Sequence, residues 1–271
     1  MAIVYVQPGS GSGGTGTAGN PYYYDSDLAT AETQAASTAT PDRKILFMDG
    51  TYNINTGVQT WDEPNVKYES ENLHGAVFDG GTSVRILRHS ATTINKIHFK
   101  NFRFDFNTGT GTSTFDQLKV ENLTAFAVGN NPGYLGGYGT GRGLTITNSI
   151  FNLNVSASTG TDNRFFKFTS GLLSLRGCTF YLDATGCPAN AFRTQGTNLN
   201  FENVIISSNN SSAFASNFEF VANSTNCCIH NIDNNTSGGT DCIFDDPQFI
   251  DLTNQDLRLR PTSPCLNKGT N

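Results

Sequence analysis

The sequence predicts an all-β fold, a parallel β-helix in which the chain winds through stacked turns. The first observation behind this prediction is a short pattern (apolar, any, apolar, any, Asn or Gly, apolar) that recurs six times between residues 97 and 232. The fifth positions are Asn101, Asn122, Asn148, Gly177, Asn203 and Asn231, which lie 21, 26, 29, 26 and 28 residues apart. A period of this length is typical of solenoids, whose repeats bury their apolar faces by stacking on one another.

The second observation is the alternation of apolar residues inside each copy. Apolar residues at every second position indicate a β-strand and exclude a helix. Asn and Gly tolerate the left-handed backbone conformation, so the fifth position predicts a tight corner that leads into a second strand. Stacking would then form two inward rows, one of Phe102, Leu123, Ser149, Cys178, Val204 and Ile232, the other of Phe104, Ala125, Phe151, Phe180, Ile206 and Asn234.

A third strand is expected in each rung, as we call one turn of the β-helix. Phe-rich segments with the same alternation lie one period apart at residues 166–168, 192–194 and 218–220. Three strands and roughly 26 residues per rung predict a β-helix of about 7–8 rungs. The six aligned corners are the main structural test of this prediction.

Several segments resemble those of a known family. Residues 4–9 and 27–36 are similar to an entry strand and a short capping helix, residues 44–52 and 75–80 to first-rung and second-rung signatures, and residues 246–264 to a closing segment. The chain thus resembles the right-handed, single-stranded parallel β-helix proteins of the pectate-lyase-like superfamily, a fold also found in phage virion and tail proteins and in surface proteins. The superfamily includes lyases, hydrolases, adhesins and virion spikes, so the resemblance implies a scaffold and no particular reaction.

The expected organisation is one structural domain with three parts. Residues 1–43 hold the first strand, a Gly-rich loop and the capping helix, residues 44–245 form the rungs, and residues 246–271 form the closing segment. The helix over residues 27–36 should turn its Ala side chains and Leu28 toward the first rung. The closing segment should fold over the opposite end with Phe249 and Leu259 inward.

Composition narrows the range of partners and locations. The chain is 37% hydrophobic and 15% charged, with a net charge of −6. This acidic balance argues against nucleic acid and anionic membranes as partners, and no apolar run is long enough to insert in a membrane. Met1 leads directly into the strand at Val4 without a signal peptide. We therefore expect a virion or extracellular protein, either released within a virus particle or trimmed from a longer chain.

The six cysteines all lie in the C-terminal half, at Cys178, Cys187, Cys227, Cys228, Cys242 and Cys265. Cys178 and Cys227 should point inward as small hydrophobic residues. Cys227 and Cys228 should face opposite sides of a strand, which argues against a shared metal site, and the spacings match no zinc signature. Buried free thiols are the favoured interpretation, and a Cys242–Cys265 bridge remains an alternative.

The candidate catalytic residues are Lys167, Arg193 and Arg164. Lyases of the superfamily use a Lys or Arg as base, often beside calcium. Lys167 and Arg193 are expected at the same outward position of successive rungs, about 5 Å apart, where like charges would lower the Lys pKa. The aligned neighbours are Thr, Gln and Asn, so calcium is unsupported and no cofactor is expected. A solvated polar face is the favoured interpretation, and we commit to no catalytic residue. The four histidines, His74, His89, His98 and His230, appear scattered in the sequence.

A glycine-rich segment at residues 129–143 is expected to project from the rungs as a loop. Its Tyr134, Tyr138 and Arg142 have the aromatic faces and guanidinium group that suit a sugar. A flexible connector with incidental tyrosines is the competing interpretation. These three residues are the candidate ligand-binding residues.

Three hypotheses for the function follow from the sequence. The first, which we favour, is a non-enzymatic structural component of a phage-like particle (a fibre, spike or decoration protein) that contacts other virion proteins, further copies of itself, or a host glycan. The second is an extracellular polysaccharide lyase or another carbohydrate-active enzyme. The third is a fragment of a cell-surface adhesin.

Overall fold

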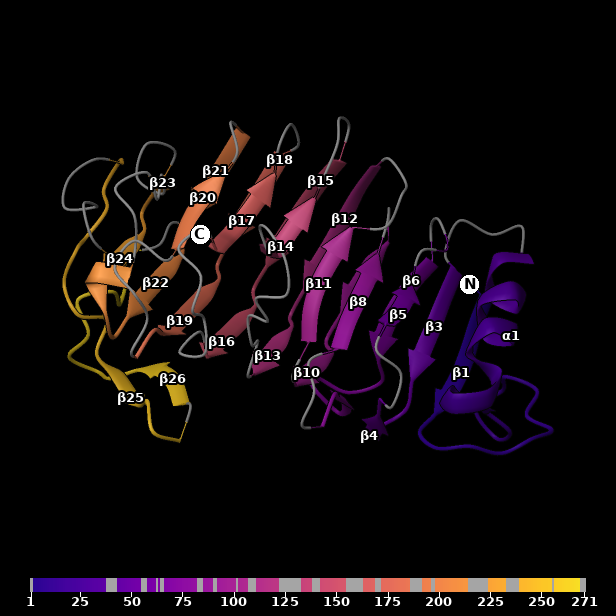
Figure 1. Ribbon diagram of the computed structural model, residues 1–271. Coiled ribbons are helices and arrows are strands. Elements are labelled where there is room, and N and C mark those ends of the chain that lie inside the picture. The colour runs from indigo at the N-terminus through magenta and orange to yellow at the C-terminus, as the bar shows by residue number, and fades with distance from the viewer. Residues whose placement is uncertain are drawn as a thin grey trace.

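The computed structural model describes residues 2–37, 43–54, 58–61, 63, 66–81, 85–89, 92–100, 102–106, 111–121, 133–137, 142–154, 163–168, 172–185, 192–195, 198–213, 224–232, 239–254 and 256–268. The strands of these residues form three long parallel sheets and one short antiparallel hairpin. Figure 1 shows the strands side by side along one elongated body, with the only helix of the described residues at the N-terminal end. The predicted parallel β-helix is confirmed.

The first sheet contains ten strands and the second contains eight. The first consists of β1 (Ala2–Gln7), β2 (Tyr22–Tyr23), β3 (Arg43–Phe47), β6 (Val66–Ser70), β9 (Thr93–Asn95), β12 (Gly111–Asp116), β15 (Arg142–Thr147), β18 (Leu172–Arg176), β21 (Asn198–Glu202) and β23 (Ser224–Thr225). The second consists of β4 (Gly50–Asn53), β7 (Ala76–Asp79), β10 (His98–Lys100), β13 (Lys119–Glu121), β16 (Ile150–Asn154), β19 (Thr179–Asp183), β22 (Ile205–Ser208) and β24 (Cys228–His230). Eight rungs along this second sheet agree with the 7–8 expected.

The third sheet contains six strands, β5 (Val58–Trp61), β8 (Arg85–His89), β11 (Phe102–Phe106), β14 (Gly133–Gly137), β17 (Asn163–Phe168) and β20 (Phe192–Gln195). The remaining elements are the helix α1 (Tyr24–Ser37), a 3-10 turn η1 (Ser211–Ala213) and the hairpin of β25 (Phe249–Asp251) and β26 (Asp256–Leu259). Three strands per rung were expected, and each rung contributes one strand to each of the three parallel sheets where the structure describes them.

The corner between the first and second sheets is a row of residues in the left-handed backbone conformation. These are His74, Lys96, Gln117, Asn148, Gly177, Asn203 and Asn226, with φ between 48° and 61°. Backbone hydrogen bonds join the row, for example from Asn148 N to Arg176 O at 3.0 Å and from Gly177 N to Glu202 O at 3.0 Å. The corner holds Lys and Gln as readily as Asn, because stacked hydrogen bonds compensate for the cost of a positive φ.

The predicted row of corners is therefore correct for Asn148, Gly177 and Asn203. Asn231 has the predicted left-handed conformation, with φ 54°, but it does not lie in this row. Asn231 follows the second-sheet strand β24, whereas Asn226 occupies the corner of that rung. Asn101 and Asn122 lie outside the described residues, but the copies that contain them also belong to the second sheet, in β10 and β13. First-sheet and second-sheet strands both alternate and both end at a corner, so the short pattern could not distinguish them.

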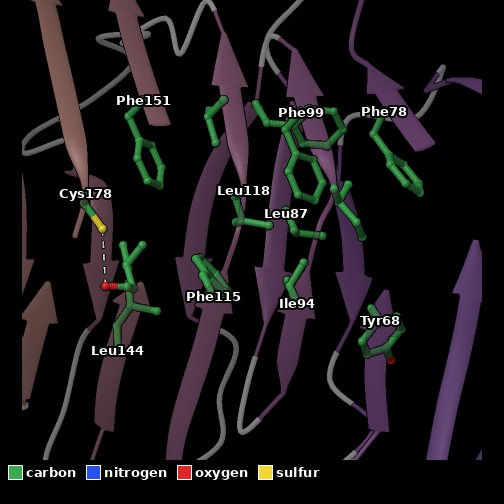
Figure 2. Close-up of a cluster of buried hydrophobic side chains, with 14 of the residues drawn as sticks. Tyr68, Phe78, Leu87, Ile94, Phe99, Phe115, Leu118, Leu144, Phe151 and Cys178 are labelled. Carbon is green, nitrogen blue, oxygen red and sulfur yellow. Dashed lines mark hydrogen bonds between the residues drawn. The ribbon is translucent and has the colours of Figure 1, made fainter. Parts of the chain in front are cut away.

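The interior of the second sheet is one continuous ladder. Pairing aligns Tyr52, Phe78, Phe99, Val120, Phe151, Phe180, Ile206 and Ile229. The rings of Phe151 and Phe180 stack with centroids 4.6 Å apart, and Figure 2 shows side chains of this ladder facing those of the opposite sheets. The expected inward positions of Phe151, Phe180 and Ile206 are confirmed. Phe104 was placed in this row wrongly, since it pairs with Leu87 in the third sheet; Ala125 and Asn234 are outside the described residues.

A second inward row follows the corner, and it contains the predicted cysteines. Leu118, Ser149, Cys178, Val204 and Cys227 are all buried in it. Cys178 donates a hydrogen bond to the Ile146 carbonyl at 3.4 Å and Cys227 to the Phe201 carbonyl at 3.6 Å. The prediction that Cys178 and Cys227 point inward is confirmed, and Cys187 lies outside the described residues.

The helix α1 covers the N-terminal end, as predicted, and begins three residues before the expected residue 27. Ala31 and Ala35 are fully buried, and Leu28 packs against the core. Asp27 Oδ2 accepts a hydrogen bond from Tyr23 N at 3.2 Å, and Tyr68 donates from its hydroxyl to Glu32 at 2.8 Å. The helix thus closes the interior by packing and by hydrogen bonds to the first rungs.

The closing segment does not fold over the C-terminal end, and this expectation is wrong. Phe249 and Leu257 of the hairpin are buried against Tyr181, with Ile205 and Leu259 partly buried beside them. Tyr181 alternates with the inward Phe180 and Leu182, so it lies on the outer face of the second sheet. The hairpin therefore packs on the outside of the β-helix, because two outward apolar side chains offer it a surface there.

Candidate functional site

The outer face of the second sheet carries two rows of polar side chains that sequence reasoning did not identify. Strand pairing aligns Val77, His98, Lys119 and Ile150 in one row, and Asp79, Lys100, Glu121 and Asn152 in the next. Parallel strands bring paired residues about 4.8 Å apart. Residues that are 21 positions apart in the sequence thus become neighbours on this face.

Four of these residues form a charged cluster, which we call the Glu121 cluster (His98, Lys100, Lys119 and Glu121). Glu121 Oε1 lies 2.5 Å from Lys119 Nζ, and Glu121 Oε2 lies 3.1 Å from His98 Nε2 and 3.9 Å from Lys100 Nζ. Among the residues that the structure describes, His98 Nε2 has no hydrogen-bond partner, and its approach to Glu121 is an electrostatic contact. One carboxylate thus lies among three basic side chains.

The electrostatics of the cluster keep Glu121 ionised. Contact with His98 is the largest influence, followed by partial burial, which opposes it, and by the hydrogen bond from Lys119; together they lower the pKa of Glu121 to about 2. A carboxylate with so low a pKa is a weak proton acceptor near neutral pH. The cluster can therefore keep its side chains ionised and link two neighbouring rungs, but it is poorly suited to general-base chemistry.

His74 lies beside this cluster at the corner. Its Nε2 is 2.9 Å from the Gln117 carbonyl oxygen, and its ring centroid is 6.5 Å from that of His98. Burial is the main cause that lowers the pKa of His74. Two histidines that looked scattered in the sequence are therefore close together, and the 21-residue offset from His98 to Lys119 and from Lys100 to Glu121 was the signal that could have revealed the cluster.

The other two histidines are not part of the Glu121 cluster. His89 ends β8 and is buried, with its Nδ1 3.0 Å from Ser113 Oγ and its ring against Phe115. Burial lowers the pKa of His89 to about 3. His230 lies further along the second sheet, with Nδ1 3.1 Å from Ser207 Oγ. His89 therefore belongs to a strand of the third sheet and faces the interior.

A second carboxylate on the outer face of the first sheet is held in the same way. Glu69 is 2.6 Å from Lys44 Nζ through Oε2 and 2.9 Å from Lys96 Nζ through Oε1. Burial opposes ionisation of Glu69, but the hydrogen bonds from both lysines outweigh it and lower the pKa. Arg176 and Glu202 form a more exposed pair at 3.2 Å further along the same sheet. Each of these pairs joins strands of different rungs or a strand and a neighbouring corner.

The candidate catalytic residues lie on the third sheet, where their register differs from the prediction. The backbone of β17 pairs with that of β20 so that Arg164 lies opposite Arg193 and Lys167 lies opposite Gln195, with an irregularity between the two pairs. The predicted alignment of Lys167 with Arg193 is wrong, because it ignored this shift. Lys167 and Arg193 therefore lack the direct cross-strand pairing on which the proposed lowering of the Lys pKa rested.

The glycine-rich segment is not simply a projecting loop. Residues Gly133–Gly137 form β14, which pairs with β11 and β17 in the third sheet, and Arg142 opens β15 opposite Gly111. Tyr134 and Arg142 thus belong to the wall of the β-helix, and Tyr138 lies outside the described residues. The alternation around Leu135 was obscured in the sequence by glycines.

Among the residues that the structure describes, no three His, Cys, Asp or Glu side chains gather as a metal site would require. Within the same residues, no helix is long and apolar enough to cross a bilayer.

Comparison with known proteins gives one structural likeness. No protein-family model matches the sequence, and no curated protein matches it. Among solved structures, the chain is similar to the crystal structure of pectate lyase Pel9A, with 17% identity and a TM-score of 0.44 over 84% of this chain. The chain spans 63% of the length of that lyase. A likeness at this level carries no argument about activity or substrate.

Proposed function

We propose that this chain is a non-enzymatic structural protein, a rigid β-helical component of a phage-like particle such as a fibre, spike or decoration protein. The proposal rests on the way in which carboxylates and basic side chains contact one another on the outer faces of the first and second sheets. Glu121 lies between Lys119 of its own strand and His98 of the preceding rung. Glu69 lies between Lys44 of the preceding rung and Lys96 of a neighbouring corner. Groups that are neutralised by one another reinforce the stack and are not held ready for a substrate.

Chemical considerations support the non-enzymatic proposal. The best-placed carboxylate of the second sheet, Glu121, has a pKa of about 2, far below the value near neutrality that favours a general base. The Lys of the lyase hypothesis, Lys167, pairs across strands with Gln195. The residue opposite Lys167 in β20 is thus Gln195 and not the basic residue that was expected to activate this Lys.

Contact with a glycan is the binding role that fits this scaffold best. Tyr134 and Arg142 lie in adjacent stretches of the third and first sheets, on the body of the β-helix. Aromatic faces and guanidinium groups suit sugar rings and hydroxyls. In this proposal a glycan chain lies along the wall of the rungs.

An assay with acidic polysaccharides tests the proposal against the lyase alternative. The purified chain should leave pectate and alginate intact, with no rise in ultraviolet absorbance from new double bonds. A rise that Lys167→Ala abolishes, while the exposed first-sheet control Lys67→Ala retains it, would establish the lyase and overturn the structural proposal.

Two further experiments test whether the chain binds a glycan and whether it is part of a virus particle. Binding without cleavage should weaken in Tyr134→Ala and persist in Tyr5→Ala, a half-exposed tyrosine of the first sheet. Antibodies against the chain should label purified particles from the source and not the surface of its cells. Labelling of the cell surface alone would favour the adhesin hypothesis instead.

A further inference from the structure

Two cysteines from distant parts of the sequence meet at the C-terminal end of the β-helix. Cys228 belongs to β24, and Cys265 lies in the segment that follows the hairpin. Both line one small cavity of about 150 Å³ together with Ile243 and Lys268. The two thiols are close enough for each to shift the pKa of the other.

The two thiols meet because Cys228 points outward from its strand, toward the C-terminal segment that carries Cys265. Cys228 occupies the outer row of the second sheet, opposite Ile205, yet it is only 3% exposed. Its Sγ donates to the Asp245 carbonyl at 3.4 Å, so chain that follows the last rung covers it. An outward cysteine is buried here because the C-terminal segment lies over it.

Hydrogen bonds hold the other partner in place. Ser263 Oγ donates to the Pro247 carbonyl at 2.6 Å and accepts from Cys265 N at 3.1 Å. These bonds tie the turn that carries Cys265 to the start of the hairpin. The two cysteines therefore meet as a consequence of defined contacts in the folded chain.

We propose that Cys228 and Cys265 form a disulfide when the folded protein meets a low-molecular-weight disulfide such as oxidised glutathione, and that this bond locks the C-terminal segment onto the last rung. Cys242, the partner considered from sequence, is engaged elsewhere. Its thiol donates to the Thr240 carbonyl at 3.6 Å, and its side chain packs against the interior core. The redox partner of Cys265 is the outward cysteine of β24.

The two thiols differ in a way that sets the order of the exchange. Contact with the Cys228 thiol is the main cause that lowers the pKa of Cys265, while contact with Cys265 and burial raise the pKa of Cys228. The thiolate is the nucleophile in thiol–disulfide exchange. Cys265, which is also the more exposed of the two, is the attacking residue.

The exchange balances in two steps. The Cys265 thiolate attacks one sulfur of oxidised glutathione, which breaks its S–S bond, forms a mixed disulfide and releases one glutathione thiolate that takes up a proton. Cys228 then gives up its proton and attacks Cys265 Sγ, which releases the second glutathione. The two protein thiols are oxidised to one disulfide, and one glutathione disulfide is reduced to two thiols.

The buried cysteines of the interior should not compete. Burial raises the pKa of Cys178 to about 12 and that of Cys227 to about 11. Both are at most 2% exposed, so little thiolate forms and a bulky disulfide cannot reach them. These two interior cysteines should therefore stay reduced in the folded chain.

The test is oxidation of the full folded chain with oxidised glutathione, followed by trapping of free thiols and cleavage on the amino side of aspartates. Cleavage before Asp233 and Asp241 separates Cys228 from Cys242. We expect a cross-linked peptide pair that contains Cys228 and Cys265, and that disappears in Cys265→Ala and in Cys228→Ser. The matched control Cys242→Ala should retain it.

A thermal measurement gives a second readout. The oxidised chain should melt roughly 5–10 °C higher than the reduced chain, because a cross-link restricts the unfolded state. Cys265→Ala, which alters only a half-exposed side chain, should show no such difference between oxidising and reducing buffer. A cross-link from Cys265 to Cys242, or thiols that all remain free in the folded chain at equilibrium, would overturn the proposal.

Discussion

The two ends of the β-helix face the same physical problem and solve it differently. Each terminal rung leaves strand edges and an apolar interior that must be shielded from water and from other chains. At the N-terminal end, α1 covers the opening and contacts the interior through Tyr24, Ala31 and Ala35. At the C-terminal end, Thr240 and Ile243 continue the sheets by single bridges, while the hairpin packs on the outer face.

The interiors behind these two ends also differ. Near the N-terminal end the core is aromatic, with Tyr52 stacked on Phe78 at 4.5 Å and Trp61 stacked on Tyr68 at 4.9 Å. Near the C-terminal end the ladders run into Ser224, Cys227 and Ile229. Large stacked rings bury more apolar area than small side chains. We infer that the N-terminal end contributes more to global stability and the C-terminal end is more open to local regulation.

Deletion of residues 1–40 should have the largest effect. It removes β1 and α1, exposes the edge of β3 and uncovers the aromatic core, so the remaining chain should aggregate. Deletion of residues 246–271 uncovers side chains of the outer face, among them Tyr181, Ile205 and Cys228, and this shorter chain should stay folded. Size-exclusion chromatography of both proteins checks the comparison, and a soluble monomer after the N-terminal deletion would contradict the capping role of α1.

Truncation of ladder phenylalanines should have the next largest effect. Phe78→Ala and Phe180→Ala each open a cavity in a fully buried site, which should cost about 3–5 kcal/mol of unfolding free energy. Phe78 has aromatic contacts with Phe47, Tyr52 and Trp61, so its truncation should lie at the upper end of this range. Chemical denaturation measures both, and equal losses would argue that the two halves of the core are equivalent.

Acidification should reveal the contribution of the Glu121 cluster. The folded-state pKa of Glu121, about 2, is below its ordinary value of 4.5, so the stabilisation is present above the ordinary value and is lost as pH falls toward 2. After allowance for partial solvent screening we expect Glu121→Gln to lose about 1–2 kcal/mol at pH 7. Denaturation at a series of pH values should show that the difference from wild type shrinks below pH 4.5.

The control for this prediction lies in the C-terminal half. Glu202 pairs with Arg176, whose side chain is 57% exposed, and exposed pairs contribute about 0–1 kcal/mol. Glu202→Gln should therefore change stability little at any pH. A larger loss from Glu202→Gln than from Glu121→Gln would contradict our account of the charged rows.

Phe249→Ala should have the smallest global effect. It weakens the contact between the hairpin and Tyr181 without touching the interior ladders, so the melting temperature should change little. The hairpin itself should become more open to proteases, because its packing surface is lost. Limited proteolysis followed by mass spectrometry tests this, and a large global loss would show that the hairpin supports the whole β-helix.

Much of the fold could be predicted from the sequence because a solenoid repeats a local rule. Alternation gave the strands, the period gave the number of rungs, and Phe151, Phe180, Cys178 and Cys227 were placed inward correctly. The helix at the N-terminal end was also predicted, from the resemblance of residues 27–36 to the capping helix of the superfamily. These features depend on residues close together in the chain or one period apart.

The register between rungs and the contacts on the outer faces were decided only by the tertiary structure. The shift that separates Lys167 from Arg193 and the meeting of His98 with Glu121 depend on rung lengths that vary. The approach of Cys265 to Cys228 depends on the path of the chain after the last rung. An error of one residue in register moves a side chain to the opposite face of a sheet. The alternating pattern therefore determined which side chains are inside, while the irregular corners determined which outer side chains meet.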